Sequence, residues 1–159
     1  MPISKIKSAT VARAIVEVTE STMADFRDGV ISGEESMTDR LVGAIRTALD
    51  GRHFGNLSWR ARTLKTSRGK GAEEKRHGAD VLGVLQVDLP EYKVAKGFLW
   101  QAKIVEPGRP MSNAQWDIFQ AQCQTMLKRT PEAFAAIYSR TEGVRFIPVT
   151  LPPKNVSQG

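Results

Sequence analysis

The sequence predicts a mixed α/β (α+β) domain in which helices flank a mixed β-sheet. The predicted elements run helix, helix, three strands, helix and two further strands, so helices and strands mix without alternating regularly. A length of 159 residues suits one domain with a real core. We expect residues 1–150 to form this domain, with residues 1–30 as a helical extension and residues 151–159 as an extended tail or truncated linker.

The first half of the chain carries two helical patterns, one strand and one loop. Apolar residues recur at helical spacing from about Ser8 to Asp28 and again from Glu34 to Asp50. The alternation over Leu57–Leu64 predicts a strand. The stretch Lys65–His77 is rich in glycine and charge, and therefore reads as a loop.

The next stretch reads as a β-hairpin. Its two apolar runs are Val81–Leu89 and Gly97–Val105, and we expect the turn near Pro90–Lys96. These two strands and the preceding one would form an antiparallel meander.

A helix and two short strands complete the predicted fold. Either Ser112 or Asn113 could cap a helix that runs to about Lys128. The segments Phe134–Tyr138 and Val144–Val149 are strand-like and are separated by a polar turn.

Composition excludes several classes of protein. No apolar run reaches the roughly 18 residues that a membrane span needs, and the N-terminus lacks the pattern of a signal peptide. The single cysteine, Cys123, excludes an internal disulfide and a multi-cysteine zinc site. We therefore expect a cytoplasmic protein with no membrane partner. The net charge of +6 favours polyanionic partners.

Polar residues interrupt the predicted hairpin. Asp80 begins the first strand, and Gln101 and Lys103 lie two apart on the second, so their side chains share one face. Because the strands are antiparallel, the start of one lies beside the end of the other, and Asp80 approaches this pair. A carboxylate and an amide oxygen are hard ligands for Mg²⁺, and an ammonium can orient water beside a phosphate. The alternative is a buried ion pair between Asp80 and Lys103, with Gln101 bonded to backbone.

The motif "GAD" followed after a hairpin by "QAK" resembles the PD-(D/E)XK nuclease superfamily, in the Gln-variant form of Mrr-like restriction endonucleases. The resemblance implies a restriction-endonuclease-like core of helix, three-stranded meander, helix and strand, in the order predicted for residues 34–149. It implies that Asp80 ligates Mg²⁺ (with Mn²⁺ able to substitute), together with Gln101 and the Ala102 carbonyl. Lys103 would position the attacking water.

The family also takes a glutamate from its first core helix. Here the segment "GEESMTDRLVGAI" offers Glu34 and Glu35, either of which could hold a second metal ion or a water on the metal. Glu34 lies at the centre of the apolar stripe of this helix and Glu35 at its edge. The alternative is that they are acids favoured by the dipole at the start of the helix. The spacing EE-x-x-TD, E-x-x-x-GAD and QAK also resembles a group of uncharacterised bacterial nuclease-like proteins, and Glu74 is a looser candidate.

The sequence departs from the family pattern at two positions. Ala79 replaces the usual proline, and Gln101 is neutral where most members carry an acid. The site therefore holds one charge fewer, which weakens the expected metal affinity.

A basic segment precedes the proposed site. Its cations suit the phosphates of a polyanion, although a solvated loop would have the same composition. The candidates for nucleic-acid binding are Arg60, Arg62, Lys65, Arg68, Lys70 and Arg76.

The first functional hypothesis is a Mg²⁺-dependent endonuclease that cuts DNA, with a role in restriction or phage defence implied by the resemblance alone. The second is a non-catalytic nucleic-acid-binding module on the same fold. The third is an interaction domain in which Asp80 and Lys103 form only an ion pair. A homodimer and a fused or separate targeting partner are left open by the sequence.

Overall fold

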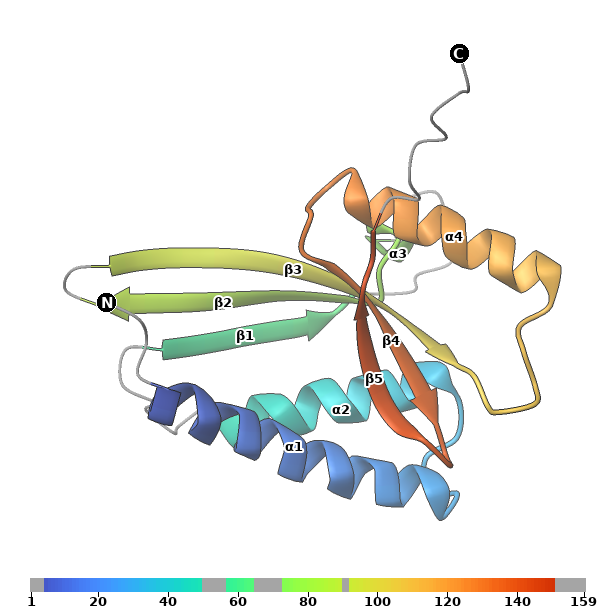
Figure 1. Ribbon diagram of the computed structural model, residues 1–159, viewed down its shortest axis with the longest axis horizontal. Helices are drawn as coiled ribbons and strands as arrows, with labels where there is room; N and C mark the ends of the chain where they lie inside the picture. The colour runs from blue at the N-terminus through green and yellow to red at the C-terminus, as the bar shows by residue number, and fades with distance from the viewer. Residues whose placement is uncertain (1–4, 50–56, 65–72, 90–91, 151–159) are drawn as a thin grey trace.

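The computed structural model describes residues 5–49, 57–64, 73–89 and 92–150. The helices in these ranges are α1 (Lys5–Arg27), α2 (Glu34–Leu49), α3 (Glu73–His77) and α4 (Asn113–Leu127). The strands are β1 (Leu57–Thr63), β2 (Val81–Leu89), β3 (Tyr92–Ile104), β4 (Ala133–Ser139) and β5 (Gly143–Pro148). Figure 1 shows α1 and α2 on one side of the sheet and α4 on the other. The predicted mixed α+β class and the order of its main elements are confirmed.

The five strands form one sheet in the order β1-β2-β3-β4-β5. The meander β1–β2–β3 is antiparallel, and β4 pairs with β5 in the same way. β3 and β4 are parallel because α4 carries the chain back across one face of the sheet. β3 changes partner near its middle: its register with β2 ends at Trp100, and its register with β4 runs from Leu99 to Ile104.

Two boundaries differ from the prediction. The segment predicted to be loop ends in the five-residue helix α3, which is too short and too charged to show an apolar period. β3 begins at Tyr92, opposite Leu89, so it occupies most of the segment assigned to the turn. The predicted tail, residues 151–159, lies outside the described residues. In the described part, no helix is long and apolar enough to cross a membrane.

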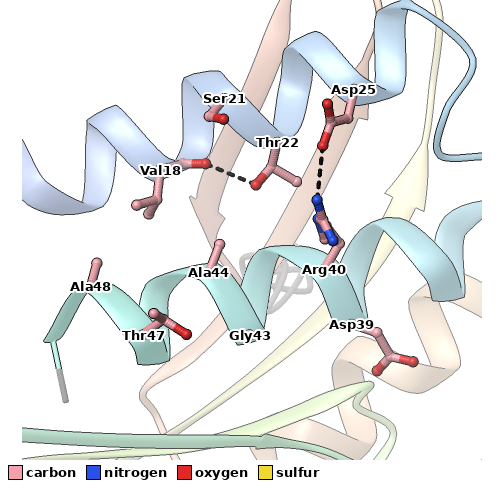
Figure 2. A pocket seen from close by; sticks show the side chains of 10 residues that line it. All are labelled: Val18, Ser21, Thr22, Asp25, Asp39, Arg40, Gly43, Ala44, Thr47 and Ala48. Carbon is pink, nitrogen blue, oxygen red and sulfur yellow. Dashed lines mark hydrogen bonds and ion pairs between the residues drawn. The ribbon is translucent and has the colours of Figure 1, made fainter.

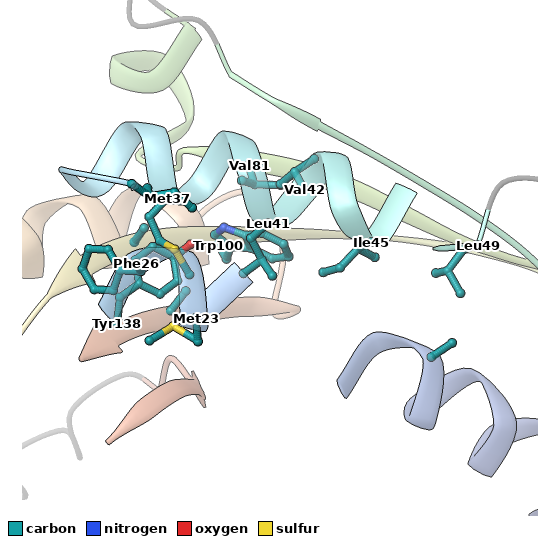
Figure 3. Close-up of a cluster of buried hydrophobic side chains, with 14 residues drawn as sticks. Met23, Phe26, Met37, Leu41, Val42, Ile45, Leu49, Val81, Trp100 and Tyr138 are labelled. Atoms are coloured by element: carbon teal, nitrogen blue, oxygen red, sulfur yellow. The ribbon is translucent and has the colours of Figure 1, made fainter. Parts of the chain in front are cut away.

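The larger core lies between the sheet and the helices α1 and α2. Figure 3 shows Phe26 of α1 and Leu41 of α2 packed near Trp100 and Tyr138 of the sheet. A smaller cluster on the other face joins Leu99 of β3 to Met126 of α4. Side chains alternate along a strand, so Gln101 and Lys103 follow Leu99 onto the α4 face. The core thus sets the side from which these polar groups approach.

The start of α4 is defined by a capping box at Ser112. The Ser112 hydroxyl accepts a hydrogen bond from the Gln115 backbone N–H at 3.3 Å, and the Gln115 side-chain oxygen accepts one from the Ser112 N–H at 2.9 Å. Of the two residues that the sequence offered, Ser112 is therefore the cap.

A groove of about 630 Å³ runs between α1 and α2 (Figure 2). Small residues such as Ser21, Gly43 and Ala44 line it, and Arg40 donates to Asp25 across it at 3.2 Å. Both partners are solvent-accessible, so this pair stabilises the fold by less than about 1 kcal/mol.

Gly78 controls how α3 and the start of β2 sit on α4. Its φ is +67°, and a Cβ there would overlap the Gln122 carbonyl oxygen and lie 2.8 Å from the Thr125 Cβ. We expect Gly78→Ala to lower the free energy of unfolding by about 2–4 kcal/mol, from backbone strain and overpacking together. Urea unfolding measures this change.

Gly143→Ala is the matched control, because Gly143 has φ +85° but has no atom within 4 Å of the position that an added methyl group would take. It should lose only the strain component, about 1–2 kcal/mol. Equal losses in the two variants would show that Gly78 does not set the contact with α4.

Candidate active site

The site is built on an open edge of β3. Beyond Trp100, β3 pairs with β4 alone in the described chain. The Leu99 N–H donates to the Glu132 carbonyl on the β4 side at 3.0 Å. Successive N–H groups point to opposite sides of a strand, so those of Ala102 and Ile104 point away from β4.

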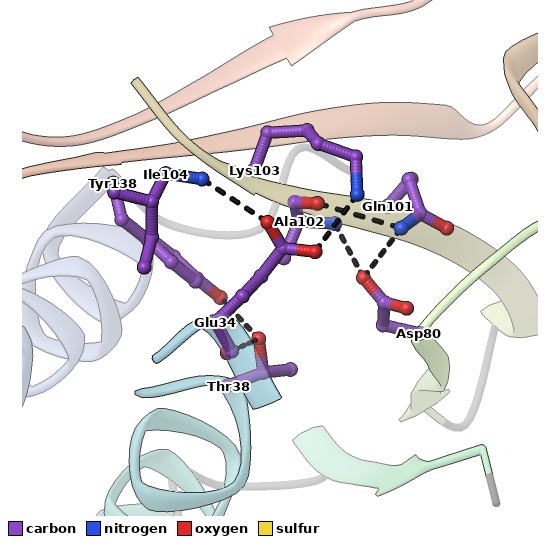
Figure 4. Close-up of polar contacts among 8 residues, drawn as sticks. All are labelled: Glu34, Thr38, Asp80, Gln101, Ala102, Lys103, Ile104 and Tyr138. Carbon is purple, nitrogen blue, oxygen red and sulfur yellow. Dashed lines mark hydrogen bonds and ion pairs between the residues drawn. The ribbon is translucent and has the colours of Figure 1, made fainter. Parts of the chain in front are cut away.

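Two carboxylates accept these outward N–H groups (Figure 4). The Ala102 N–H donates to Asp80 Oδ2 at 2.7 Å, and the Ile104 N–H donates to Glu34 Oε2 at 3.2 Å. The acceptors come from different elements, since Asp80 directly precedes β2 and Glu34 begins α2. The open edge therefore brings two acids to neighbouring positions along one strand.

The backbone of Asp80 is held on both sides. Its N–H donates to the Trp100 carbonyl at 2.9 Å, and its carbonyl accepts from the Leu64 N–H at 2.7 Å. Asp80 thus makes the last backbone hydrogen bond to β3 at the start of β2, and it also bonds to the residue that follows β1. Because the sheet fixes the backbone of Asp80, it also sets the position of the Asp80 carboxylate.

Gln101 is buried, with 1% of its surface exposed. Its Nε2 donates to Asp80 Oδ2 at 2.8 Å and to the Ala102 carbonyl at 3.4 Å. Both neighbours are acceptors, so the amide nitrogen and not the oxygen faces Asp80. The Gln101 Oε1 atom is buried and has no hydrogen-bond partner among the residues that the structure describes. A buried carbonyl oxygen without a partner is costly, so this atom is available as a ligand for a cation or as an acceptor for water.

Lys103 forms an ion pair with Glu34. Its Nζ donates to Glu34 Oε1 at 2.8 Å, and the two side chains are 19% and 34% exposed. Glu35, the alternative acid from the sequence, is exposed on the first turn of α2. The structure therefore brings together Glu34, Asp80, Gln101 and Lys103.

A buried pair of hydroxyl groups, from Tyr138 and Thr38, contacts the backbone of Glu34. Tyr138 lies beside Ile104 in the β3–β4 register, and its hydroxyl is 3.1 Å from Thr38 Oγ1. Thr38 Oγ1 also donates to the Glu34 carbonyl at 2.8 Å. Burial raises the pKa of Tyr138, as do the charges of Asp80 and Glu34, so its hydroxyl stays protonated. Sequence reasoning missed both residues, although a threonine within the apolar stripe of α2 was an available signal.

The thiol of Cys123 on α4 lies within electrostatic range of Lys103. Burial raises the pKa of Cys123, and the Lys103 ammonium partly offsets that rise. At neutral pH the thiol is therefore protonated, and it acts as a packing group beside the site.

Several oxygen atoms at the site could serve as ligands for a hard divalent cation. The carboxylates of Asp80 and Glu34, the Ala102 carbonyl and the unpartnered Gln101 Oε1 are oxygen ligands of the kind that Mg²⁺ prefers. No group of three or more His, Cys, Asp or Glu residues in the described ranges could hold a metal. A cation here would therefore depend on amide and backbone oxygens and on water, which Mg²⁺ commonly retains.

The predicted basic segment is only partly described. Arg62 on β1 and Arg76 on α3 are exposed. Arg60 belongs to β1, but nothing of its side chain is described. Lys65, Arg68 and Lys70 lie outside the described residues, as does the side chain of Glu74.

The chain has a distant structural likeness to a restriction endonuclease. No family model matches it, and no curated protein matches it significantly. A solved structure of the MspJI restriction endonuclease in complex with a 27-mer oligonucleotide aligns with a TM-score of 0.34 and 14% identity. The alignment covers 88% of this chain and 26% of the other, so this chain spans about a quarter of that protein's length. Likeness at this level carries no functional argument.

Removal of the Asp80 carboxylate should lower the free energy of unfolding, because backbone N–H groups at the open edge of β3 need an acceptor. Asp80→Ala leaves the Ala102 N–H without an acceptor and leaves the Gln101 amide with only its 3.4 Å contact to the Ala102 carbonyl. We expect a loss of about 1–3 kcal/mol in the free energy of unfolding. Asp80→Asn keeps an acceptor oxygen and should lose about 1 kcal/mol or less. Urea unfolding of both variants checks this order, and wild-type stability in Asp80→Ala would mean that the carboxylate does not hold the edge.

Proposed function

We propose that this protein is a metal-dependent nuclease that hydrolyses phosphodiester bonds of DNA. One observation carries the proposal: Glu34, Asp80, Gln101 and Lys103, separated in sequence, meet at the open edge of β3. Two acids, an amide with an unpartnered oxygen and an ammonium form a set suited to hydrolysis of a phosphate ester. The motif resemblance to PD-(D/E)XK nucleases supports the same conclusion, and a role in restriction or phage defence is proposed from that resemblance alone.

Phosphodiester hydrolysis needs a water oxygen to attack phosphorus, an ester P–O bond to break and a proton to reach the leaving oxygen. A divalent cation, when bound, polarises the phosphate and makes nearby water more acidic. Asp80 and the Ala102 carbonyl would hold it, with Glu34 beside them, and Gln101 Oε1 would join them once the amide turns over from the orientation in which its nitrogen faces Asp80. Lys103 keeps its ammonium near the same edge through Glu34. From there it can orient the attacking water and offset charge that develops on the phosphate.

A second candidate function is a nucleic-acid-binding module without catalysis. The specific observation in its favour is that the polar groups already bond to one another. Asp80 accepts from Gln101 and Ala102, while Glu34 accepts from Lys103 and Ile104. Such a network can be purely structural, and metal-dependent cleavage separates the two functions.

Asp80→Asn and Lys103→Met should each lower plasmid nicking in Mg²⁺ by at least about 100-fold, because each removes a group that acts in the transition state. Lys96→Met is the matched control. Lys96 lies on the same strand and pairs with Glu132 at 3.2 Å, away from the site. We expect Lys96→Met to nick as wild type does, and EDTA to abolish all nicking. Wild-type nicking by Asp80→Asn and Lys103→Met would contradict the proposed site.

Gln101→Glu tests for the metal without measuring activity. The Gln101 Nε2 atom lies 2.8 Å from Asp80 Oδ2, so a carboxylate in its place would repel Asp80 unless a cation lies nearby. We expect the variant to melt below wild type in EDTA and to regain stability with Mg²⁺, with a larger Mg²⁺-dependent rise in Tm than wild type shows. Gln86→Glu, at an exposed position on β2, is the control for the change in charge. A Gln101→Glu variant that Mg²⁺ does not stabilise would favour the structural role.

A further inference from the structure

Four basic residues gather where α3 meets the end of α4. Lys75 and Arg76 lie in the last turn of α3, and Lys128 and Arg129 directly follow the last turn of α4. All four are exposed. We call this set the α3–α4 basic surface.

The structure holds the two halves of this surface together. Gly78 leaves no space between its Cα and the backbone of α4 at Gln122. The Arg129 guanidinium donates to the Arg76 carbonyl at 3.4 Å, so one arginine sits on the end of the helix that carries the other. That contact uses one of five guanidinium N–H donors and leaves the charge available.

Among the side chains that the structure describes, no carboxylate pairs with these four cations. The side chains of Glu73 and Glu74, at the start of α3, lie outside that description. Glu132, the next acid along the chain after Arg129, pairs instead with Lys96. The negative ends of the helix dipoles favour a cation at each terminus, by about 0.3–1 kcal/mol. That effect explains each residue singly, but it does not explain why two helix ends bring four cations to one place. A bound polyanion would relieve their mutual repulsion.

The α3–α4 basic surface also borders the candidate active site. Arg76 precedes Asp80 by four positions in the sequence. On α4, Gln122 touches Gly78, and its neighbour Cys123 lies within electrostatic range of Lys103. The same contact between α3 and α4 therefore links the basic surface to the edge of β3.

We propose that the α3–α4 basic surface binds the phosphate backbone of duplex DNA beside the active site. The proposal rests on the proposed function for the identity of the polyanion. It overlaps the basic segment that the sequence predicted only at the end of that segment, at Lys75 and Arg76, and it adds Lys128 and Arg129. Because phosphate contacts carry no base information, this surface would position the duplex and leave sequence choice to other residues.

The test is a salt titration of DNA binding in EDTA, with a short duplex of mixed sequence and the full chain. Arg76→Gln/Lys128→Gln removes two charges and leaves the Arg129 contact in place. The control, Arg13→Gln/Arg27→Gln, removes two exposed charges from α1 on the other side of the sheet. We expect the slope of log affinity against log salt to become shallower by about 1.8 in the first variant, which corresponds to roughly sixtyfold weaker binding at 0.1 M salt. The control should keep the wild-type slope. Each variant loses a cation at a helix C-terminus, so Tm should fall by only a few degrees in both, and cooperative melting shows that both are folded.

Two outcomes would overturn the inference. One is an unchanged slope in Arg76→Gln/Lys128→Gln, and the other is an equal change in the control, which would reflect net charge alone. Plasmid nicking in Mg²⁺ is measured separately. If the wild type nicks plasmid but the slope is unchanged in the variant, the inference about this surface is wrong and the proposed function stands. If the slope changes as expected but no protein nicks plasmid, the surface binds DNA and the proposed nuclease activity is contradicted.

Discussion

The unequal pairing of β3 is the constraint on which the site depends. β3 loses β2 at Trp100 but continues beside β4 to Ile104, so its outward N–H groups need acceptors from elsewhere. A buried N–H without a partner costs about 1–3 kcal/mol. Asp80 and Glu34 provide the acceptors, and in doing so two acids from distant segments become fixed along one edge. The geometry that satisfies the sheet is therefore the geometry that assembles the site.

Packing of the apolar core also sets the positions of the charged groups at the site. Burial of Met37 and Leu41 sets the rotation of α2, which turns Glu34 toward β3. The hydroxyls of Tyr138 and Thr38 then fix the first turn of that helix at the end of the strand. On the other face, α4 packs against Leu99 of β3, and its Cys123 lies within electrostatic range of Lys103. Helices on both faces of the sheet thus place side chains near the end of β3.

Much of this arrangement was predictable from local pattern. The antiparallel hairpin alone brings Asp80 near Gln101, and the helical wheel placed Glu34 at the centre of the stripe now seen to be buried. The choice between Glu34 and Glu35 needed tertiary contacts, because only the position of α2 against β3 decides which acid reaches Ile104. The sequence also could not predict the orientation of the Gln101 amide. The nitrogen and oxygen ends of an amide have nearly the same shape, and only the neighbouring acceptors distinguish them. The same holds for α3, whose five residues carry too little periodicity to predict a helix.

The central proposal is that the open edge of β3 holds a divalent cation at Asp80 and the Ala102 carbonyl, with Glu34 beside it. Addition of Mn²⁺ to the labelled protein, followed by amide NMR, tests it directly, because a paramagnetic ion broadens only nearby signals. The account predicts that the Ala102 and Ile104 amides broaden at substoichiometric Mn²⁺ while those of α1 stay sharp, and that Asp80→Asn removes the effect. Broadening that is absent from β3, or that persists in Asp80→Asn, would contradict the claim.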